Sequence, residues 1–188
     1  MAGLSSPFGG SDTGDLYDGY DEFVPEHIPE PGSNLDGHRL LTGDEHVAFH
    51  RLTRDLFEER GVYDMTFNYN LARLNLDTRH ESAGFRYAED SDDSAVLWAE
   101  FTPTTAFCPQ SHTLIIGAFR AWNGLSDRHE YDLVRVRLSE MHHQHETINE
   151  RLEGLEAEFL ETGSVAPPSD ADGEPVGDDG LGSDQSPF

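Results

Sequence analysis

Lysine is absent from this chain of 188 residues, so all 12 basic residues are arginines, and they stand against 37 aspartates and glutamates. The acidic excess is not confined to the ends, because 20 acidic residues and 11 arginines lie between His46 and Leu160. Dispersed arginines do not form the basic stripe that contacts to phosphates require. We therefore expect no direct binding of nucleic acid.

The even spread of acidic residues favours a protein adapted to a cytosol of molar salt. At about 1 M ionic strength the Debye length is roughly 3 Å, so self-repulsion is screened and a carboxylate-rich surface stays soluble. The alternative is an acidic protein that mimics DNA or binds basic partners. That alternative needs concentrated charge, whereas the charge here is spread along the chain.

Cysteine is nearly absent as well, since Cys108 is the only one. A single thiol excludes an intramolecular disulfide framework and a zinc site built from several thiolates of one chain. No apolar run approaches the roughly 18 to 20 residues that span a bilayer. The first residues also lack the basic start and apolar stretch of a secretion signal. We expect a cytoplasmic protein without membrane contact.

Both ends of the chain are poor in residues that could build a core. Residues 1–42 are rich in Gly, Pro, Ser and acids, and residues 163–188 contain no basic residue. Such segments cannot bury enough apolar surface to offset the cost of ordering the backbone. We predict disordered acidic tails on either side of one domain that spans residues 43–162.

The pattern of apolar residues inside that domain predicts an α+β fold, a small mixed sheet of about three strands packed with helices. The expected order is helix, two strands, helix, strand, helix. The first helix starts after Thr42 or Asp44 and ends at Gly61, and the last runs from about His145 to Leu160. Segments 81–90 and 94–104 read as an antiparallel hairpin, 130–138 as a strand, and Pro109 as the first turn of a helix.

Cys108 falls between the strand that ends near Thr104 and the helix that begins at Pro109. Free amides and the helix dipole favour an anion at a helix N-terminus, which lowers the pKa of a thiol from about 8.5. Cys108 is therefore a candidate reactive thiol or metal ligand. The alternative is a buried, inert small residue.

The run Phe101, Thr102, Pro103, Thr104, followed by Cys108, resembles the signature of an iron–sulfur cluster assembly family. That family includes the SufT and PaaD proteins and the eukaryotic cytosolic iron–sulfur targeting factor. In it, a strand ends in Thr-Pro-Thr, and a reactive cysteine begins the next helix. This chain departs from the pattern at Ala106, where many members carry proline, and "TLIIG" lies one residue out of step.

Two more segments are similar to the same family, so that the resemblance covers roughly residues 44–160. "MHHQHETINERL" places His142 on a family histidine, and "VYDMTFNYNLARLNLD" places Asp64 on a family aspartate. The second segment also departs from the family. Met65 and Thr66 stand where the family has proline and glutamate, Arg73 replaces an acid, and Asn75 replaces a glycine.

The resemblance implies an assembly or maturation factor in which Cys108 accepts or passes iron, sulfur or a transient iron–sulfur cluster, assisted by Asp64 and His142. Its partners would be iron–sulfur assembly proteins and client apoproteins. His112 lies one helical turn after Cys108 and joins His142 as a candidate metal ligand. With one thiolate per chain, a stable cluster needs a homodimer or a partner's cysteines. For His112, His143 and His145, however, solvated surface residues are the favoured interpretation.

Two other functions remain open at this stage. One is a non-catalytic adaptor whose core and tails serve only as docking surfaces, a reading favoured by loss of the acidic motif at Met65 and Thr66. The other is a cysteine-dependent hydrolase or transferase, in which His142 or His112 activates Cys108 and helix amides hold an oxyanion. Nothing in the sequence resembles a nucleophile elbow, so an assembly or adaptor protein is favoured over an enzyme.

Overall fold

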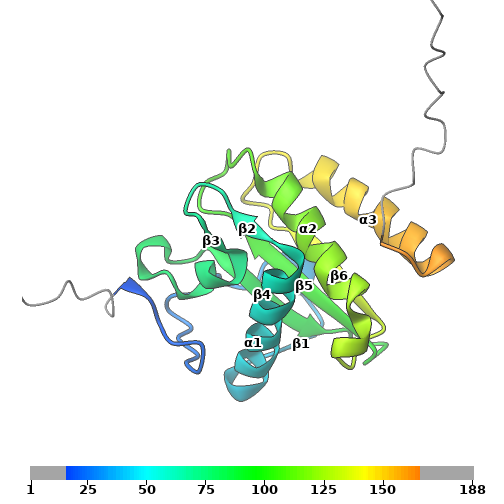
Figure 1. The fold of residues 1–188 in the computed structure, drawn as a ribbon, viewed down its shortest axis with the longest axis horizontal. Coiled ribbons are helices and arrows are strands. Elements are labelled where there is room, and N and C mark those ends of the chain that lie inside the picture. Colours follow the sequence, from blue (N-terminus) through cyan, green and yellow to red (C-terminus); the bar gives the residue numbers. More distant parts are fainter. Residues whose placement is uncertain (1–15, 166–188) are drawn as a thin grey trace, which may run out of the picture.

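The computed structural model describes residues 16–165, which form a mixed sheet covered by helices (Figure 1). In chain order the elements are η2 (Ser33–Leu35), β1 (Arg39–Leu40), α1 (Gly43–Arg60), β2 (Tyr63–Asp64), β3 (Tyr69–Asn70), η3 (Leu71–Leu76), η4 (Thr78–His80), β4 (Gly84–Glu89), β5 (Val96–Thr102), α2 (Ser111–Gly124), η5 (Ser126–Arg128), β6 (Leu133–Leu138) and α3 (His145–Thr162), where η marks a 3-10 helix. The predicted α+β class is confirmed. None of the helices in the described part of the chain is long and apolar enough to cross a membrane.

The main sheet has the strand order β1-β4-β5-β6, and β2 pairs with β3 in a separate small hairpin. Strands β4 and β5 form the predicted antiparallel hairpin, with Phe85 opposite Phe101. Strand β6 pairs parallel with β5, so α2 serves as the crossover connection that a parallel pair requires. As a result, the loops that follow β5 and β6 leave the sheet at the same end.

The predicted helices are present, and the main difference is a later start of α2. Thr42 is extended at the start of α1, and Gly61 ends that helix in the left-handed conformation, with φ of 68°. This is the usual glycine stop of a helix. Helix α3 starts at His145 as predicted, whereas α2 starts at Ser111, two residues after Pro109. Cys108 therefore lies between the strand and the helix as predicted, but three residues before the first residue of α2 rather than directly before it.

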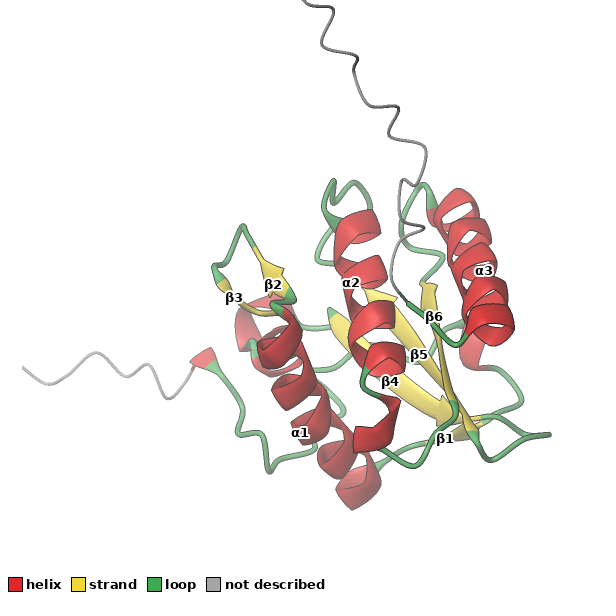
Figure 2. Cartoon of the chain, turned by 45° about the vertical axis from the view of Figure 1, so that its right-hand side comes forward, coloured by secondary structure: helices red, strands yellow, loops and turns green. Residues whose placement is uncertain are grey.

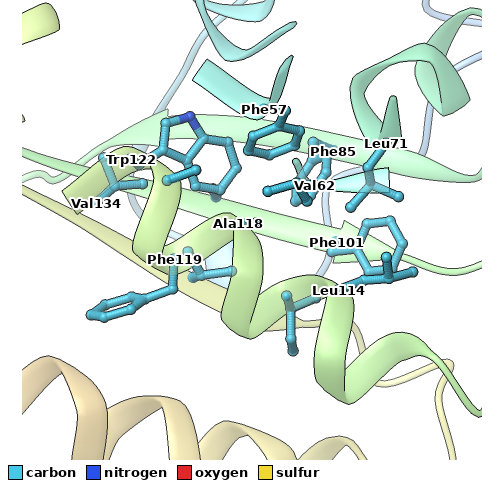
Figure 3. Close-up of a cluster of buried hydrophobic side chains, with 14 of the residues drawn as sticks. Phe57, Val62, Leu71, Phe85, Phe101, Leu114, Ala118, Phe119, Trp122 and Val134 are labelled. Atoms are coloured by element: carbon cyan, nitrogen blue, oxygen red, sulfur yellow. The ribbon is translucent and has the colours of Figure 1, made fainter. Parts of the chain in front are cut away.

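The main core lies between the sheet and the helices α1 and α2, as the close-up in Figure 3 shows. Trp122 of α2 is fully buried there, and its ring lies 5.0 Å from that of Phe57 and 5.3 Å from that of Phe85. The indole N–H donates to the hydroxyl of Thr53 at 3.1 Å. Aromatic packing and this satisfied polar contact fix α1 and α2 relative to the strands.

Residues 16–38 form what we call the N-terminal strap, whose first part packs beside α1 and whose residues 29–38 cover the other face of the sheet. The strap binds the sheet mainly through backbone groups: Gly32 N–H donates to the carboxylate of Glu100 at 2.6 Å, and Arg86 donates to the carbonyl oxygen of Pro29 at 2.9 Å. The ring of His38 stacks on Trp98 with 4.9 Å between centroids. Glu100 and Arg86 are buried beneath these contacts.

The predicted N-terminal tail boundary at residue 42 is therefore wrong. Within the strap, Ile28 and Leu35 are only 6% and 4% exposed, and β1 adds an edge strand to β4. A segment of low apolar content becomes ordered because the rest of the domain offers it partners for both apolar and polar groups. Residues 1–15 and 166–188 of the predicted tails lie outside the described residues.

Helix α3 packs beside the edge strand β6 and against α2 (Figure 2). Its residues Ile148 and Leu152 join the core. On the strap side of the sheet, Glu156 forms ion pairs with Arg135 at 3.0 Å and with Arg137 at 3.1 Å. These ion pairs give partners to both arginines of β6, of which Arg137 is buried.

Candidate functional site

Cys108 sits in the loop between β5 and α2, at the end of the sheet where the parallel strands finish. Pro103 follows the last residue of β5, and the chain turns through residues 104–110 before α2 starts. The N–H of Cys108 donates to the carbonyl of Thr105 at 3.3 Å, and its carbonyl accepts the N–H of Ser111 at 3.4 Å. The residue is partly exposed. The loop therefore holds the backbone of Cys108 while leaving the residue open to solvent.

His142 is buried, at 1% exposure, in the loop between β6 and α3. Its Nδ1 accepts the N–H of Gln144 at 3.1 Å, so the ring proton is on Nε2, which donates to the carbonyl oxygen of Cys108 at 3.0 Å. Both ring nitrogens thus bind backbone groups. Among the described residues, no hydrogen bond joins His142 to the sulfur of Cys108.

His143 adds a second link between the same two loops. Its backbone N–H donates to the carbonyl oxygen of Ala106 at 3.0 Å, and its Nδ1 lies 2.7 Å from that oxygen. The imidazole ring also packs against Phe107, with 4.9 Å between ring centroids. Because β5 and β6 end side by side, the loop that carries Cys108 is fastened to the loop before α3 through both histidines.

The β2–β3 hairpin reaches the same region from the other side (Figure 1). Gln110 accepts the N–H of Met65 at 3.2 Å and donates to the hydroxyl of Thr66 at 2.7 Å. Asp64 is buried, and its carboxylate accepts the N–H groups of Thr66 and Phe67 at 2.7 and 3.2 Å. Asp64 thus shapes the hairpin tip, and the tip contacts the loop two residues after Cys108.

The proposed metal ligands do not converge. His112 is exposed on α2 and makes no hydrogen bond or ion pair within residues 16–165. In that part of the chain, no group of three or more His, Cys, Asp and Glu side chains is placed to hold a metal ion. Metal binding by Cys108, His142 and His112 stays a prediction, and it requires donors from a second chain.

Large apolar side chains are exposed in all three segments around Cys108. Phe107 is 73% exposed, Met65 at the hairpin tip is 76% exposed, and Met141 in the β6–α3 loop is 42% exposed. Within the described residues, the only other large hydrophobic side chain with such exposure is Leu160 near the end of α3. Exposed apolar groups gathered around a functional site are typical of surfaces that contact another protein.

A family model described as "Domain of unknown function (DUF7998)" matches residues 15–166. The chain belongs to this family. The match includes the N-terminal strap, the sheet and all three α-helices, so the DUF7998 domain spans the whole described part of the chain. No curated protein and no solved structure matches the sequence.

The sequence indicated some of this site in the DUF7998 domain but not its architecture. Cys108 and His142 were expected to lie together, and a backbone hydrogen bond does join them. The contacts of Gln110, Phe107 and His143 were not predicted, because they depend on loops that meet only in the folded chain. The available signal is the uneven histidine cluster next to α3, in which His142 is a predicted site residue and His143 and His145 are predicted surface residues.

Proposed function

We propose that this protein is an iron–sulfur cluster assembly or maturation factor that acts through the thiol of Cys108. The observation that carries the proposal is the position of this sole cysteine, a partly exposed residue in a loop held by Thr105, Ser111 and His142. The resemblance of the Thr-Pro-Thr run and its downstream cysteine to the SufT and PaaD family supports it. The partners are iron–sulfur assembly proteins and client apoproteins in the cytoplasm.

The chemistry is a ligand exchange on a cargo metal. The thiolate of Cys108 bonds to an iron of the cargo as a donor's cysteine leaves, and a client's cysteine later replaces Cys108 in the same way. No electrons are gained or lost in either step. Because one thiolate cannot hold a cluster alone, a second copy of the chain or the partner supplies the remaining ligands.

Two residues near the thiol have positioning roles in this proposal. His142 fixes the carbonyl of Cys108, and Asp64 fixes the hairpin tip that contacts Gln110. Neither side chain needs to touch the cargo. Their contribution is to keep the loop in a single conformation, which limits the entropy lost when a partner docks.

Anaerobic reconstitution with ferrous iron and sulfide at high salt tests the proposal. We expect the wild-type chain to gain visible absorption and protein-bound iron, and Cys108→Ser to gain neither. Thr113→Ala is the matched control, because that side chain is exposed on the adjoining helix and is not a candidate metal ligand. Equal iron content in wild type and Cys108→Ser would contradict the proposal.

A non-catalytic docking protein is the second candidate, favoured by the exposure of Phe107 and Met65. A pull-down from a halophilic host at high salt separates the two functions. An adaptor binds its partners equally well with Cys108→Ser but loses them with Phe107→Ser. Leu160→Ser removes an exposed apolar side chain elsewhere and serves as the control. An assembly factor loses cargo transfer with Cys108→Ser even where partner binding persists.

A further inference from the structure

A hollow lies at the opposite end of the sheet from Cys108. It has a volume of about 320 Å³ and is formed by the first half of α1, by β1, by the end of β4 and by the loop before β6. Strand β5 separates the two ends, and its seven residues span about 23 Å at roughly 3.3 Å per residue. The volume falls in the range of small-molecule sites.

Three aromatic rings surround this hollow. Phe49 lies 5.8 Å from Tyr131 and 6.4 Å from His129 between ring centroids, in edge-to-face arrangements, and His129 lies 6.1 Å from Tyr131. His129 is held in a fixed orientation, since Nδ1 accepts the N–H of Tyr131 and Nε2 bonds to the carbonyl of Trp122. Rings set at angles around one space attract a cation through their π-faces.

The rim of the hollow carries three carboxylates and one guanidinium. Arg39 bridges Glu45 and Glu89 at 2.8 and 2.7 Å, so these two acids share a single positive charge. Glu130 is exposed and makes no ion pair or hydrogen bond within the described residues. The side of the rim formed by Glu130 therefore has an unbalanced negative charge.

Besides the carboxylates of the rim, the hollow is lined by Tyr131, which carries a hydroxyl. Tyr131 is only 4% exposed and lines the hollow, yet its hydroxyl has no hydrogen-bond partner among residues 16–165. Burial raises the pKa of Tyr131 to about 12, with Glu89 and Glu130 adding to the rise and Arg39 opposing it. Because Tyr131 lines the hollow and its hydroxyl has no partner among these residues, the hydroxyl oxygen can accept a hydrogen bond from a bound polar group.

We propose that this hollow binds a small primary or secondary alkylammonium ion. The ammonium donates hydrogen bonds to Glu130 and to the hydroxyl oxygen of Tyr131, while the rings of Phe49 and His129 contact the cation and its alkyl chain. The apolar floor of Leu41 and Leu52 accepts the alkyl chain. An anion is excluded by the rim, and a neutral alcohol can donate a hydrogen bond but lacks the positive charge that Glu130 and the ring faces attract.

Titration of the full chain with propylammonium chloride, followed by amide chemical shifts in NMR spectra, tests this site. Total chloride is held constant at molar concentration, so that general attraction to the acidic surface is screened. We expect saturable shifts centred on Glu130 and Tyr131, and much smaller ones with 1-propanol. Glu130→Gln and Tyr131→Phe should each weaken binding about tenfold, since a hydrogen bond to a charged group is lost.

The matched control is Glu161→Gln, which removes the same charge from an exposed position on α3 and should leave binding unchanged. Shifts that stay linear with concentration would overturn the proposal, as would equal shifts with 1-propanol or equal weakening by Glu130→Gln and Glu161→Gln. Because Glu130 is exposed, its variant decides the question even if Tyr131→Phe unfolds.

Discussion

The imidazole of His142 donates a hydrogen bond to the backbone carbonyl of Cys108, although the two residues are 34 positions apart in the chain. The contact is made because parallel strands β5 and β6 end together, so that their loops meet. The histidine that sequence resemblance marks as a site residue thus acts on the cysteine through its backbone. The predictions below follow from this and related contacts.

Replacing His142 by alanine should loosen the loop that carries Cys108. The substitution removes two hydrogen bonds and a buried ring, so we expect the free energy of unfolding to fall by about 2 to 4 kcal/mol. The rate of Cys108 alkylation in the folded protein should rise, because the loop samples open conformations. Urea unfolding and thiol labelling measure both effects. His112→Ala should change neither, and unchanged labelling in His142→Ala would show that the contact does not order the loop.

The domain should lose stability as the pH falls below about 6.5, the ordinary pKa of histidine. Burial lowers the pKa of His46 to about 3 and that of His50 to about 4. The folded state keeps both rings neutral, whereas the unfolded chain takes up protons as the pH falls, so protonation favours unfolding. The stabilisation is complete above about pH 6.5 and is lost progressively towards pH 3 to 4.

Urea unfolding between about pH 7 and pH 4 measures this slope, to which each histidine contributes at most about 1.4 kcal/mol per pH unit. His46→Leu should make the slope shallower, since it removes one of the two groups and a ring nitrogen, Nδ1, that has no hydrogen-bond partner within the described residues. Identical slopes in both proteins would mean that His46 does not titrate differently in the folded and unfolded states.

Gly84→Ala should be strongly destabilising. Gly84 has φ of 123°, and a Cβ there would lie 2.2 Å from Oδ1 of Asn75. That amide side chain accepts the N–H of Phe85 and donates to its carbonyl, so it cannot move without breaking both bonds. We expect a loss of about 3 kcal/mol or more. Gly154→Ala, where a Cβ meets open space on α3, should stabilise by about 0.5 to 1 kcal/mol. Thermal melts of the two variants compare the cases directly.

The net charge of −25 should make stability depend on salt. Raising potassium chloride from about 0.1 M to about 2 M shortens the Debye length to a few ångströms and screens repulsion among carboxylates. We expect the thermal midpoint to rise across this range. Sodium chloride should act similarly, since screening depends on ionic strength. A midpoint that is flat or falls with salt would contradict adaptation to molar salt.

Most helices and strands could be predicted because their signals are local. The spacing of apolar residues between Thr42 and Gly61 predicts α1, and the alternation of apolar and polar residues predicts β4 and β5. The parallel pairing of β6 and the edge strand β1 could not be inferred in this way. They depend on pairing between distant segments, in which Arg39 lies opposite Glu89 and Val96 pairs with Leu133.

The candidate site, too, could be predicted only where its features depend on neighbouring residues. The position of Cys108 between a strand and a helix follows from neighbouring residues, and Pro109 marks the approach to α2. The contacts of Gln110 with Met65 and of His143 with Ala106 cannot be deduced from spacing, since each joins separate loops. The partners of a loop are set by topology, which the local pattern does not encode.

The N-terminal strap determines how this protein can be shortened. A chain that begins at residue 43, where the sequence pattern suggests a domain start, would lack the amide that binds Glu100 and the carbonyl that binds Arg86. The charges of Glu100 and Arg86 would then be exposed to water on one face of the sheet. Trp98 would also lose its stacking contact with the ring of His38. A shortened chain should therefore start near residue 16. If a chain that starts later precipitates, the cause would be the loss of the N-terminal strap rather than a change in the loop of Cys108.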